Sequence, residues 1–149
     1  STTARRRPLG GTVEVMSSGT DDGTRLVRRY LDAFATGDPD AVAACVTVDF
    51  VNEHLSELGS GCTGRDEYRR RLAGFLTDFA ELRYEVLDVV GSEAAGGPVV
   101  ARYRMHATHA GHPIEVPGMM WFEVRDGLIA RRTDLWDSLT FLRQTGQAD

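Results

Sequence analysis

The sequence separates into a first half with helical periodicity and a second half with strand-like alternation, and this order limits the folds open to the chain. Apolar residues recur at helical spacing from Thr24 onward, and Gly37 provides a C-terminal stop. Asp38 can cap a short second helix that has Pro39 in its first turn. The elements expected in this half are helices over 24–37, 39–46 and 65–79, an extended segment over 48–54 and a Gly/Ser-rich loop over 55–64.

Four strand-like runs fill the second half, and turn signals separate them. The pair Asp126-Gly127 between two apolar runs is typical of a tight hairpin. Helices followed by consecutive strands joined through short turns predict an α+β arrangement with an antiparallel meander, rather than a parallel sheet. The expected strands cover 82–90, 98–109, 114–124 and 128–137, and a short terminal helix is expected over 138–146.

The length of 149 residues is that of one domain. Residues 1–23 are rich in Ser, Thr, Gly and Arg without a sustained period, so they are predicted to form a flexible tail ahead of a domain over 24–146. Met16 is interpreted as a candidate for an alternative natural start. Cys45 and Cys62 cannot form a disulfide framework, and the chain shows neither a signal peptide nor a membrane-length apolar run, which predicts a cytoplasmic protein.

The basic residues are all arginine, because the sequence contains no lysine. This excludes Schiff-base chemistry, a P-loop lysine and a lysine general base. The formal net charge is −5, and the one basic run, Arg5-Arg6-Arg7, lies near the N-terminus. Neither nucleic acid nor a membrane is therefore an expected partner.

A carboxylate on the last predicted strand is the leading candidate for chemistry. Period-two alternation places Arg132, Asp134 and Trp136 on one face of that strand. Apolar surroundings raise the pKa of a carboxyl group, whereas an adjacent arginine lowers it. Asp134 is therefore interpreted either as a general acid or base in a cavity, or as a structural ion-pair partner of Arg132 or Arg102.

Basic side chains also alternate along the strand predicted over 98–109. Arg102, Arg104 and His106 share one face, and Tyr103 lies on the other. The basic face is either a polar rim that stabilises an oxyanion inside a cavity, or a solvated surface of the sheet.

Phe50, Asn52 and His54 alternate onto a common face after the second helix. An asparagine both donates and accepts hydrogen bonds, so Asn52 is suited to hold a water or polarise a carbonyl. His54 has the side chain best suited to proton transfer near neutral pH. The alternative is an asparagine at a loop entry and a histidine at the surface.

No metal or other cofactor is expected. His106, His109 and His112 are close in sequence, but the first two point to opposite faces of a strand and the third lies beyond a turn. The bulky run Met119–Phe122 is interpreted as core or subunit interface, or as the lining of a site for a lipophilic ligand.

The stretch from Thr24 to Gly146 resembles the nuclear-transport-factor-like superfamily, in its branch of SnoaL-like polyketide cyclases, ketosteroid isomerases and limonene-epoxide hydrolases. The resemblance is carried by the first helix with Gly37-Asp38, by Gly64-Arg65-Asp66, and by Phe122–Ile129 leading into Asp134–Asp137. It implies a cone-shaped, strongly curved sheet packed against three helices (a cystatin-like α+β barrel), in a homodimer.

The resemblance also implies roles for single residues. Asn52, Arg102 and Asp134 match the asparagine, the arginine and the water-activating aspartate of the epoxide hydrolases. Phe50 stands in place of their tyrosine, and Arg104 in place of their second aspartate. Asp134 also matches the single aspartate that serves the polyketide cyclases as acid and base, with Asp137 as the competing assignment.

These observations together predict cofactor-free acid–base chemistry, a cyclisation or an isomerisation, on a small lipophilic molecule with a carbonyl group. An epoxide hydrolase and a non-catalytic ligand-binding module are the alternatives. A binding module predicts that an arginine locks Asp134 in a bidentate pair away from any cavity. The catalytic candidates are Asp134, Arg102, Asn52, His54 and His106, and the candidates for substrate contact are Phe50, Arg104, Met120, Trp121, Arg132, Trp136 and Tyr30.

Overall fold

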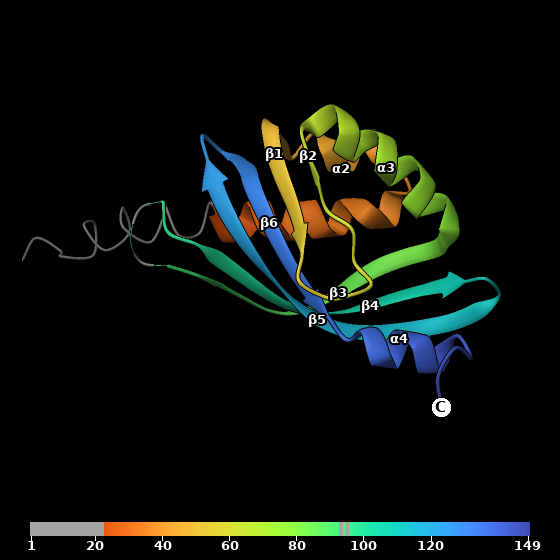
Figure 1. The fold of residues 1–149 in the computed structure, drawn as a ribbon. Helices are drawn as coiled ribbons and strands as arrows, with labels where there is room; N and C mark the ends of the chain where they lie inside the picture. The colour runs from red at the N-terminus through yellow and green to blue at the C-terminus, as the bar shows by residue number, and fades with distance from the viewer. Residues whose placement is uncertain (1–22, 93, 95) are drawn as a thin grey trace, which may run out of the picture.

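The computed structural model of the protein describes residues 23–92, 94 and 96–149. It contains one six-stranded sheet with the strand order β2-β1-β6-β5-β4-β3. The sheet is strongly curved, and helices α2 and α3 lie over its concave side (Figure 1). The predicted flexible tail lies outside the described residues except for Gly23, which already belongs to the first helix.

Helical elements follow the predicted order, with shorter ends. The first helix covers 23–33 in the described part of the chain and continues into the 3-10 turn η1 (Phe34–Thr36). Gly37 ends it with a φ of 71° and donates its N–H to the Phe34 carbonyl. Asp38 caps α2 (Pro39–Ala43) as expected, by accepting from the Asp40 N–H. The helix stops before Val46 because that residue begins a strand.

The third helix, α3 (Arg65–Asp78), also ends one residue before the prediction. Phe79 pairs instead with His109 and starts the strand β3. Tyr68 and Leu72 are the buried residues of α3. The helix thus packs against the core through one face and leaves most of its charged residues exposed: Asp66, Arg69, Arg70, Arg71 and Asp78.

Four strands form the predicted meander: β3 (Phe79–Gly91), β4 (Val99–His109), β5 (His112–Arg125) and β6 (Leu128–Trp136). Each pairs antiparallel with the next. The β5–β6 hairpin turns at Asp126-Gly127, and both residues have positive φ, which is the backbone that an Asp-Gly pair favours.

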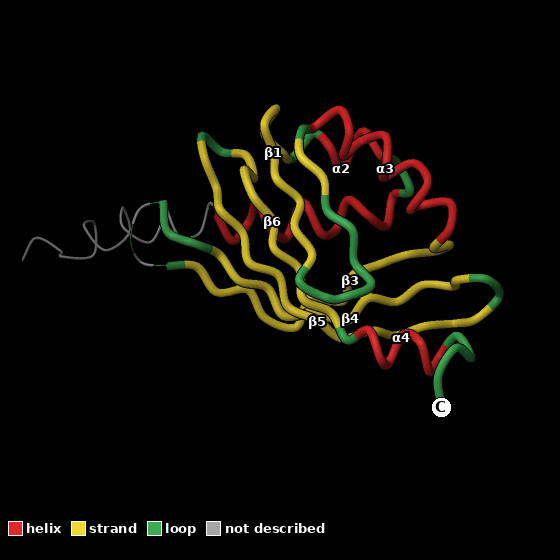
Figure 2. Tube along the Cα trace, viewed as in Figure 1, coloured by secondary structure: helices red, strands yellow, loops and turns green. Residues whose placement is uncertain are grey.

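The first strand makes the sheet mixed. Strand β1 (Val46–His54) runs parallel to β6, and the short β2 (Cys62–Thr63) pairs antiparallel with β1 at the edge. Residues 46–54 and 128–136 are thus neighbours, although most of the domain separates them in sequence (Figure 2). This pairing brings Asn52 opposite Arg132 and His54 opposite Asp134.

The core lies between the helices and the concave face of the sheet. Tyr30 and Phe34 of the first helical segment pack edge-on against each other, and Tyr30 packs against Phe122 of β5 in the same way. Helix α4 (Ser138–Gln144) closes one end, where the Gln144 side chain bonds both backbone groups of Glu115. None of the helices in the described part of the chain has the length and apolar character needed to span a bilayer.

Candidate active site

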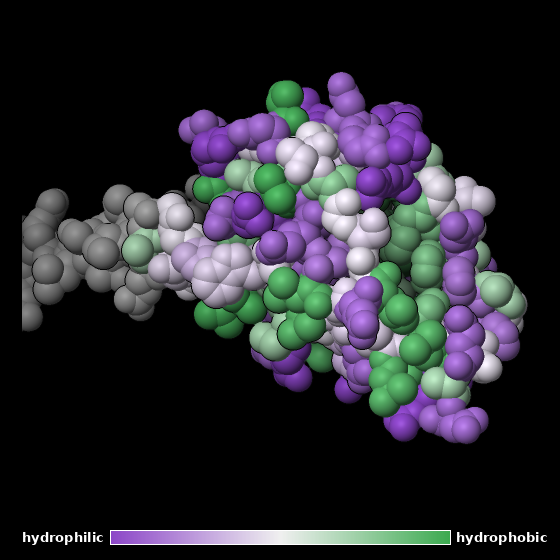
Figure 3. Space-filling model, viewed as in Figure 1, coloured by the Kyte–Doolittle hydropathy of each residue, from purple (hydrophilic) through white to green (hydrophobic). Residues whose placement is uncertain are grey.

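A cavity of about 480 Å³ lies between the helices and the sheet. Figure 3 shows a hollow in the molecular surface with hydrophobic residues around it. A polar cluster occupies one part of the lining, and it consists of Asn52, His54, Tyr103, Arg132, Asp134 and Trp136. The apolar lining consists of Phe34, Leu58, Leu72, Phe75, Phe79, Met105, Val116 and Phe141.

Strand β6 delivers three of the polar residues. Arg132, Asp134 and Trp136 all line the cavity, as the alternation along this strand predicts. The first two are buried, with exposed fractions of 4% and 3%. Asp137, the competing assignment, instead caps α4 at the surface by accepting from the Thr140 N–H.

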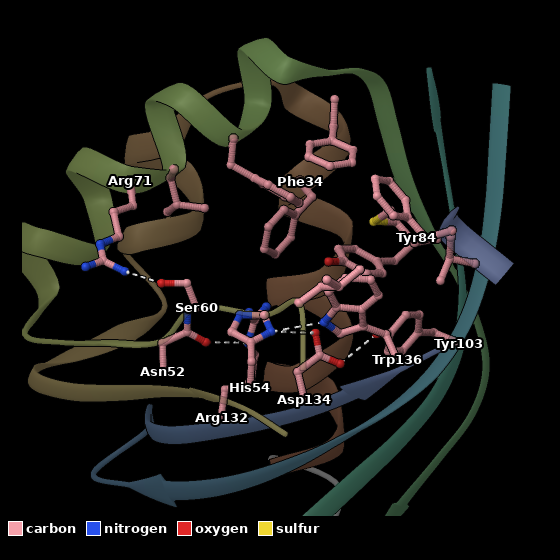
Figure 4. Close-up of a pocket in the computed structure, with 18 of the residues that line it drawn as sticks. Phe34, Asn52, His54, Ser60, Arg71, Tyr84, Tyr103, Arg132, Asp134 and Trp136 are labelled. Carbon is pink, nitrogen blue, oxygen red and sulfur yellow. Dashed lines mark hydrogen bonds and ion pairs between the residues drawn. The ribbon is translucent and has the colours of Figure 1, made fainter. Parts of the chain in front are cut away.

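Asp134 accepts a hydrogen bond of 2.6 Å from the hydroxyl of Tyr103 (Figure 4). Its other carboxylate oxygen lies 3.8 Å from Nδ1 of His54. Burial raises the pKa of Asp134, and the charge of Arg132 and the bond from Tyr103 oppose part of this rise. The result is a carboxyl group that lines a cavity and holds a proton more tightly than it would in water.

Gly118 of β5 makes the contact between Tyr103 and Asp134 possible. Tyr103 pairs with Gly118, and Gly118 pairs with Trp136 of β6. A Cβ atom on Gly118 would lie 2.4 Å from the Tyr103 hydroxyl oxygen and 2.9 Å from the Leu135 carbonyl oxygen. The tyrosine therefore reaches over β5 to β6 at the one position where β5 has no side chain.

Arg132 is buried without a carboxylate in direct contact. Its Nε donates to Oδ1 of Asn52 at 3.0 Å, and Nη1 donates to the Tyr30 hydroxyl at 3.0 Å. Within the described residues, no ion pair of 4.0 Å or less joins it to an acid. A guanidinium has five N–H donors, so donors remain for an oxygen atom in the cavity.

His54 lies between two N–H donors, but a neutral imidazole has a single acceptor nitrogen and so accepts from only one of them. The indole Nε1 of Trp136 donates to its Nδ1 at 3.2 Å, and Nη2 of Arg132 lies 3.4 Å from its Nε2. Burial, followed by the charge of Arg132, lowers the pKa of His54 to about 4. At neutral pH this ring is uncharged, so it does not act as an imidazolium acid.

The structure does not bring Arg102, Arg104 and His106 to the cavity. They lie on the other face of β4, where Arg102 and Arg104 form ion pairs with Asp88 at 2.6 Å and Glu115 at 3.6 Å. His106 is hydrogen-bonded to Glu85 at 2.9 Å. Of the two interpretations of this basic face, the solvated surface is the one that the structure supports. The arginine beside Asn52 is Arg132, and the place expected for Arg102 is thus occupied from a different strand.

Besides Arg104, four of the residues expected to contact substrate are absent from the lining of this cavity. Phe50 and Met120 are fully buried in the core, and Phe50 packs against the Tyr68 ring. Trp121 is 47% exposed. Tyr30 lies behind the cavity, where its hydroxyl contacts Arg132 and the hydroxyl of Tyr68.

Sequence reasoning missed three tyrosines that line the cavity: Tyr68, Tyr84 and Tyr103. A signal for Tyr103 was present, because it alternates with Arg102 and Arg104 and stands on the more apolar face of its strand. The prediction instead selected the opposite face of the strand, which carries the charged residues Arg102 and Arg104. In the described part of the chain, no three His, Cys, Asp or Glu side chains are grouped so as to hold a metal ion.

The fold and this site can now be compared with known proteins. Residues 27–132 match the family described as the SnoaL-like domain. The chain belongs to this family. The match confirms the resemblance found in the sequence, and the curved mixed sheet under helices confirms the expected cone-shaped α+β fold.

Solved structures similar to this SnoaL-like domain have names from several enzyme classes. A candidate polyketide cyclase from Xanthomonas campestris pv. campestris is 27% identical with a TM-score of 0.70, over 85% of this chain and 98% of that chain. An LEH-like epoxide hydrolase from M. tuberculosis is 21% identical with a TM-score of 0.72, over 85% and 94%.

A hypothetical protein with a ketosteroid isomerase-like fold from Catenulispora acidiphila is 19% identical to the SnoaL-like domain, with a TM-score of 0.73, over 81% of this chain and 92% of that chain. The similarities to the epoxide hydrolase and to the Catenulispora acidiphila protein concern the fold alone. Among proteins with curated descriptions, none matches the chain.

Proposed function

We propose that this SnoaL-like domain is a cofactor-free enzyme that cyclises or isomerises a small lipophilic molecule with a carbonyl group, using Asp134 as general base and acid. The observation that carries the proposal is a buried carboxyl group that lines an apolar cavity, accepts a bond from Tyr103 and has a raised pKa. A base whose pKa lies closer to the working pH is better matched to proton transfer at carbon.

The proposed reaction begins when the Asp134 carboxylate takes a proton from the carbon next to the carbonyl. The C–H electron pair moves into the new C–C double bond, and the carbonyl oxygen becomes an enolate oxygen. The remaining N–H donors of Arg132 stabilise this negative charge in surroundings of low polarity. Return of the proton to another carbon completes an isomerisation. Alternatively, the enolate carbon attacks a second carbonyl, a C–C bond closes the ring as the C=O π bond breaks, and the new alkoxide oxygen takes the proton from Asp134.

The two alternative functions are less well supported by the geometry. A binding module would hold Asp134 in a bidentate pair with an arginine, but within the described residues its closest polar partners are Tyr103 and His54. Epoxide opening through Arg102 is incompatible with the ion pair of that residue on the outer face. Asp134 is therefore the proposed base, and Arg132 has the role that was expected of Arg102.

Proton abstraction is testable without knowledge of the natural substrate. The probe is 2-tetralone, an apolar bicyclic ketone with acidic hydrogens next to its carbonyl, and NMR in D₂O measures hydrogen–deuterium exchange at those carbons. We expect the protein to accelerate the exchange and D134N to lower that acceleration by about 10²- to 10⁴-fold, the usual cost of losing a general base.

The matched control is D88N, which makes the same substitution on the solvated face of the sheet. It should exchange the probe at the wild-type rate. An unchanged rate in D134N would contradict the proposal, and so would a wild-type rate no faster than that of buffer. Because burial raises the pKa of Asp134, D134N should also be at least as stable as wild type at pH 7, so lost activity would not reflect unfolding.

A further inference from the structure

A chain of hydrogen bonds leads from the buried arginine to the wall of the cavity. Arg132 Nη1 donates to the Tyr30 hydroxyl at 3.0 Å, and that hydroxyl is hydrogen-bonded to the hydroxyl of Tyr68. Tyr30 has no exposed surface, whereas Tyr68 lies among the residues that line the cavity. The two tyrosines come from the first helix and from α3, so the chain crosses the core between elements distant in sequence.

The direction of this chain follows from counting hydrogens. A guanidinium only donates, so the Tyr30 oxygen accepts from Arg132 and its own hydrogen must find another acceptor. Within the described residues, the only other hydrogen-bond partner of Tyr30 is the Tyr68 oxygen. If Tyr68 donated instead, the hydrogen of Tyr30 would be left unpaired in the core, at the cost of a buried unsatisfied donor.

Tyr68 therefore accepts from Tyr30 and keeps its own hydrogen free. We infer that the Tyr68 hydroxyl is a ligand-binding donor that hydrogen-bonds an acceptor oxygen, a carbonyl or its enolate, of the molecule in the cavity. Each bond from Arg132 through Tyr30 polarises the next, so the last hydroxyl is a stronger donor than an isolated tyrosine. Burial raises the pKa of Tyr68, so the hydrogen stays in place throughout the neutral range.

This inference deepens the proposed function, since it adds a donor for the oxygen on which negative charge develops. It also identifies a ligand property: an oxygen acceptor on an apolar body. Tyr103 does not take this role because its hydrogen is already donated to Asp134. Thr77 lies on the exposed face of α3, where its hydroxyl donates to the Ala73 carbonyl, and it provides a control hydroxyl on the same helix as Tyr68.

The experiment uses 9-fluorenone, a flat apolar ketone that has no hydrogen next to its carbonyl and so cannot take part in proton abstraction. Isotope-edited infrared spectroscopy measures the carbonyl stretch of the bound probe, and equilibrium dialysis measures its affinity. We expect the wild-type protein to shift the stretch to lower wavenumber. Y68F should show a smaller shift, because only the donors of Arg132 remain for the carbonyl oxygen, and it should bind the probe roughly 2- to 10-fold more weakly, as for one neutral hydrogen bond.

Two further variants keep the test decisive. T77V removes a hydroxyl from the exposed face of the same helix, so it should retain both the shift and the affinity. Y30F keeps the Tyr68 hydroxyl but breaks its link to Arg132, so it should show a smaller shift than wild type; it also provides the answer if Y68F does not fold.

An equal carbonyl frequency in wild type and Y68F would overturn the inference, as would an equal change of the shift in T77V and Y68F, an unchanged shift in Y30F, or no binding of the ketone. The probe does not exchange hydrogen, so this result is independent of the exchange experiment on D134N. Failure of Tyr68 as a donor and failure of Asp134 as a base are thus distinguishable.

Discussion

At the scale of single residues, the site keeps one ionisable ring uncharged in the interior. His54 has a pKa of about 4 in the folded protein, against an ordinary value of 6.5. The unfolded chain therefore binds a proton at this position before the folded chain does as the pH falls. His54 contributes stability that is complete above pH 6.5 and is lost as the pH falls toward 4.

We expect H54Q to flatten this part of the stability curve. The free energy of unfolding of H54Q should change less between pH 6.5 and 4.5 than that of the wild type. In the wild type, protonation of His54 lowers the free energy of unfolding by at most about 3 kcal/mol between pH 6.5 and 4. Urea denaturation at a series of pH values measures the difference. The raised pKa of Asp134 acts with the opposite sign, because protonation of that buried carboxyl on acidification favours the folded state.

The comparison should therefore be repeated in the D134N background, where only the His54 contribution remains in the cluster. Arg132 is the other charged group facing the ring, and it keeps its charge throughout this range. Parallel pH profiles of D134N and H54Q/D134N would contradict the assignment of His54 as a neutral buried ring.

At the scale of elements, the middle of β5 determines how β4 and β6 share the site. Gly118 leaves room for Tyr103 to cross to Asp134, and a Cβ there would collide with the Tyr103 hydroxyl and with backbone of β6. We expect G118A to destabilise the protein by about 1–3 kcal/mol through overpacking. Its rate of 2-tetralone exchange should fall below that of the wild type, because the Tyr103 hydroxyl can no longer reach Asp134.

The matched control is G74A, a glycine of α3 around which an added Cβ meets nothing within 4 Å. That substitution should stabilise the protein by roughly 0.5–1 kcal/mol, because alanine is the better helix former. Thermal unfolding and the exchange rate measure both variants. Wild-type activity in G118A would show that the Tyr103–Asp134 contact does not depend on the missing side chain.

At the scale of the whole molecule, the outer face of the sheet carries exposed apolar residues. Met119 and Trp121 of β5 and Leu135 of β6 are about half exposed, at 50%, 47% and 54%. Ion pairs flank them, so this face presents both arginines and carboxylates. A face with both signs of charge around an apolar centre can pair with a copy of itself about a two-fold axis, and we propose that it forms a homodimer.

We expect light scattering with size-exclusion chromatography to give twice the chain mass of 16.4 kDa. W121D should shift the population to monomer, because it places a charge in the centre of the apolar contact. The control A73D adds the same charge at an exposed position of α3, which covers the opposite side of the sheet, and should stay dimeric. A monomeric wild type at micromolar concentration would contradict the proposal.

The sequence alone determined the order of helices and strands, the cap at Asp38, the Asp-Gly hairpin and the shared face of Arg132, Asp134 and Trp136. These features depend on local chemistry: periodicity, capping and turn conformation act within a few residues. Asn52 and His54 were likewise predicted to share a face, and both line the cavity.

Only the tertiary structure decided which face of each strand points inward and which strands are neighbours. Alternation defines two faces of β4 but does not say which one meets the core, so Arg102 was expected inside although Tyr103 is there. The parallel pairing of β1 with β6 joins segments about 80 residues apart, and it brings Asn52 and His54 to Arg132 and Asp134. Such long-range contacts depend on how all the apolar surfaces are buried together, which no local pattern specifies.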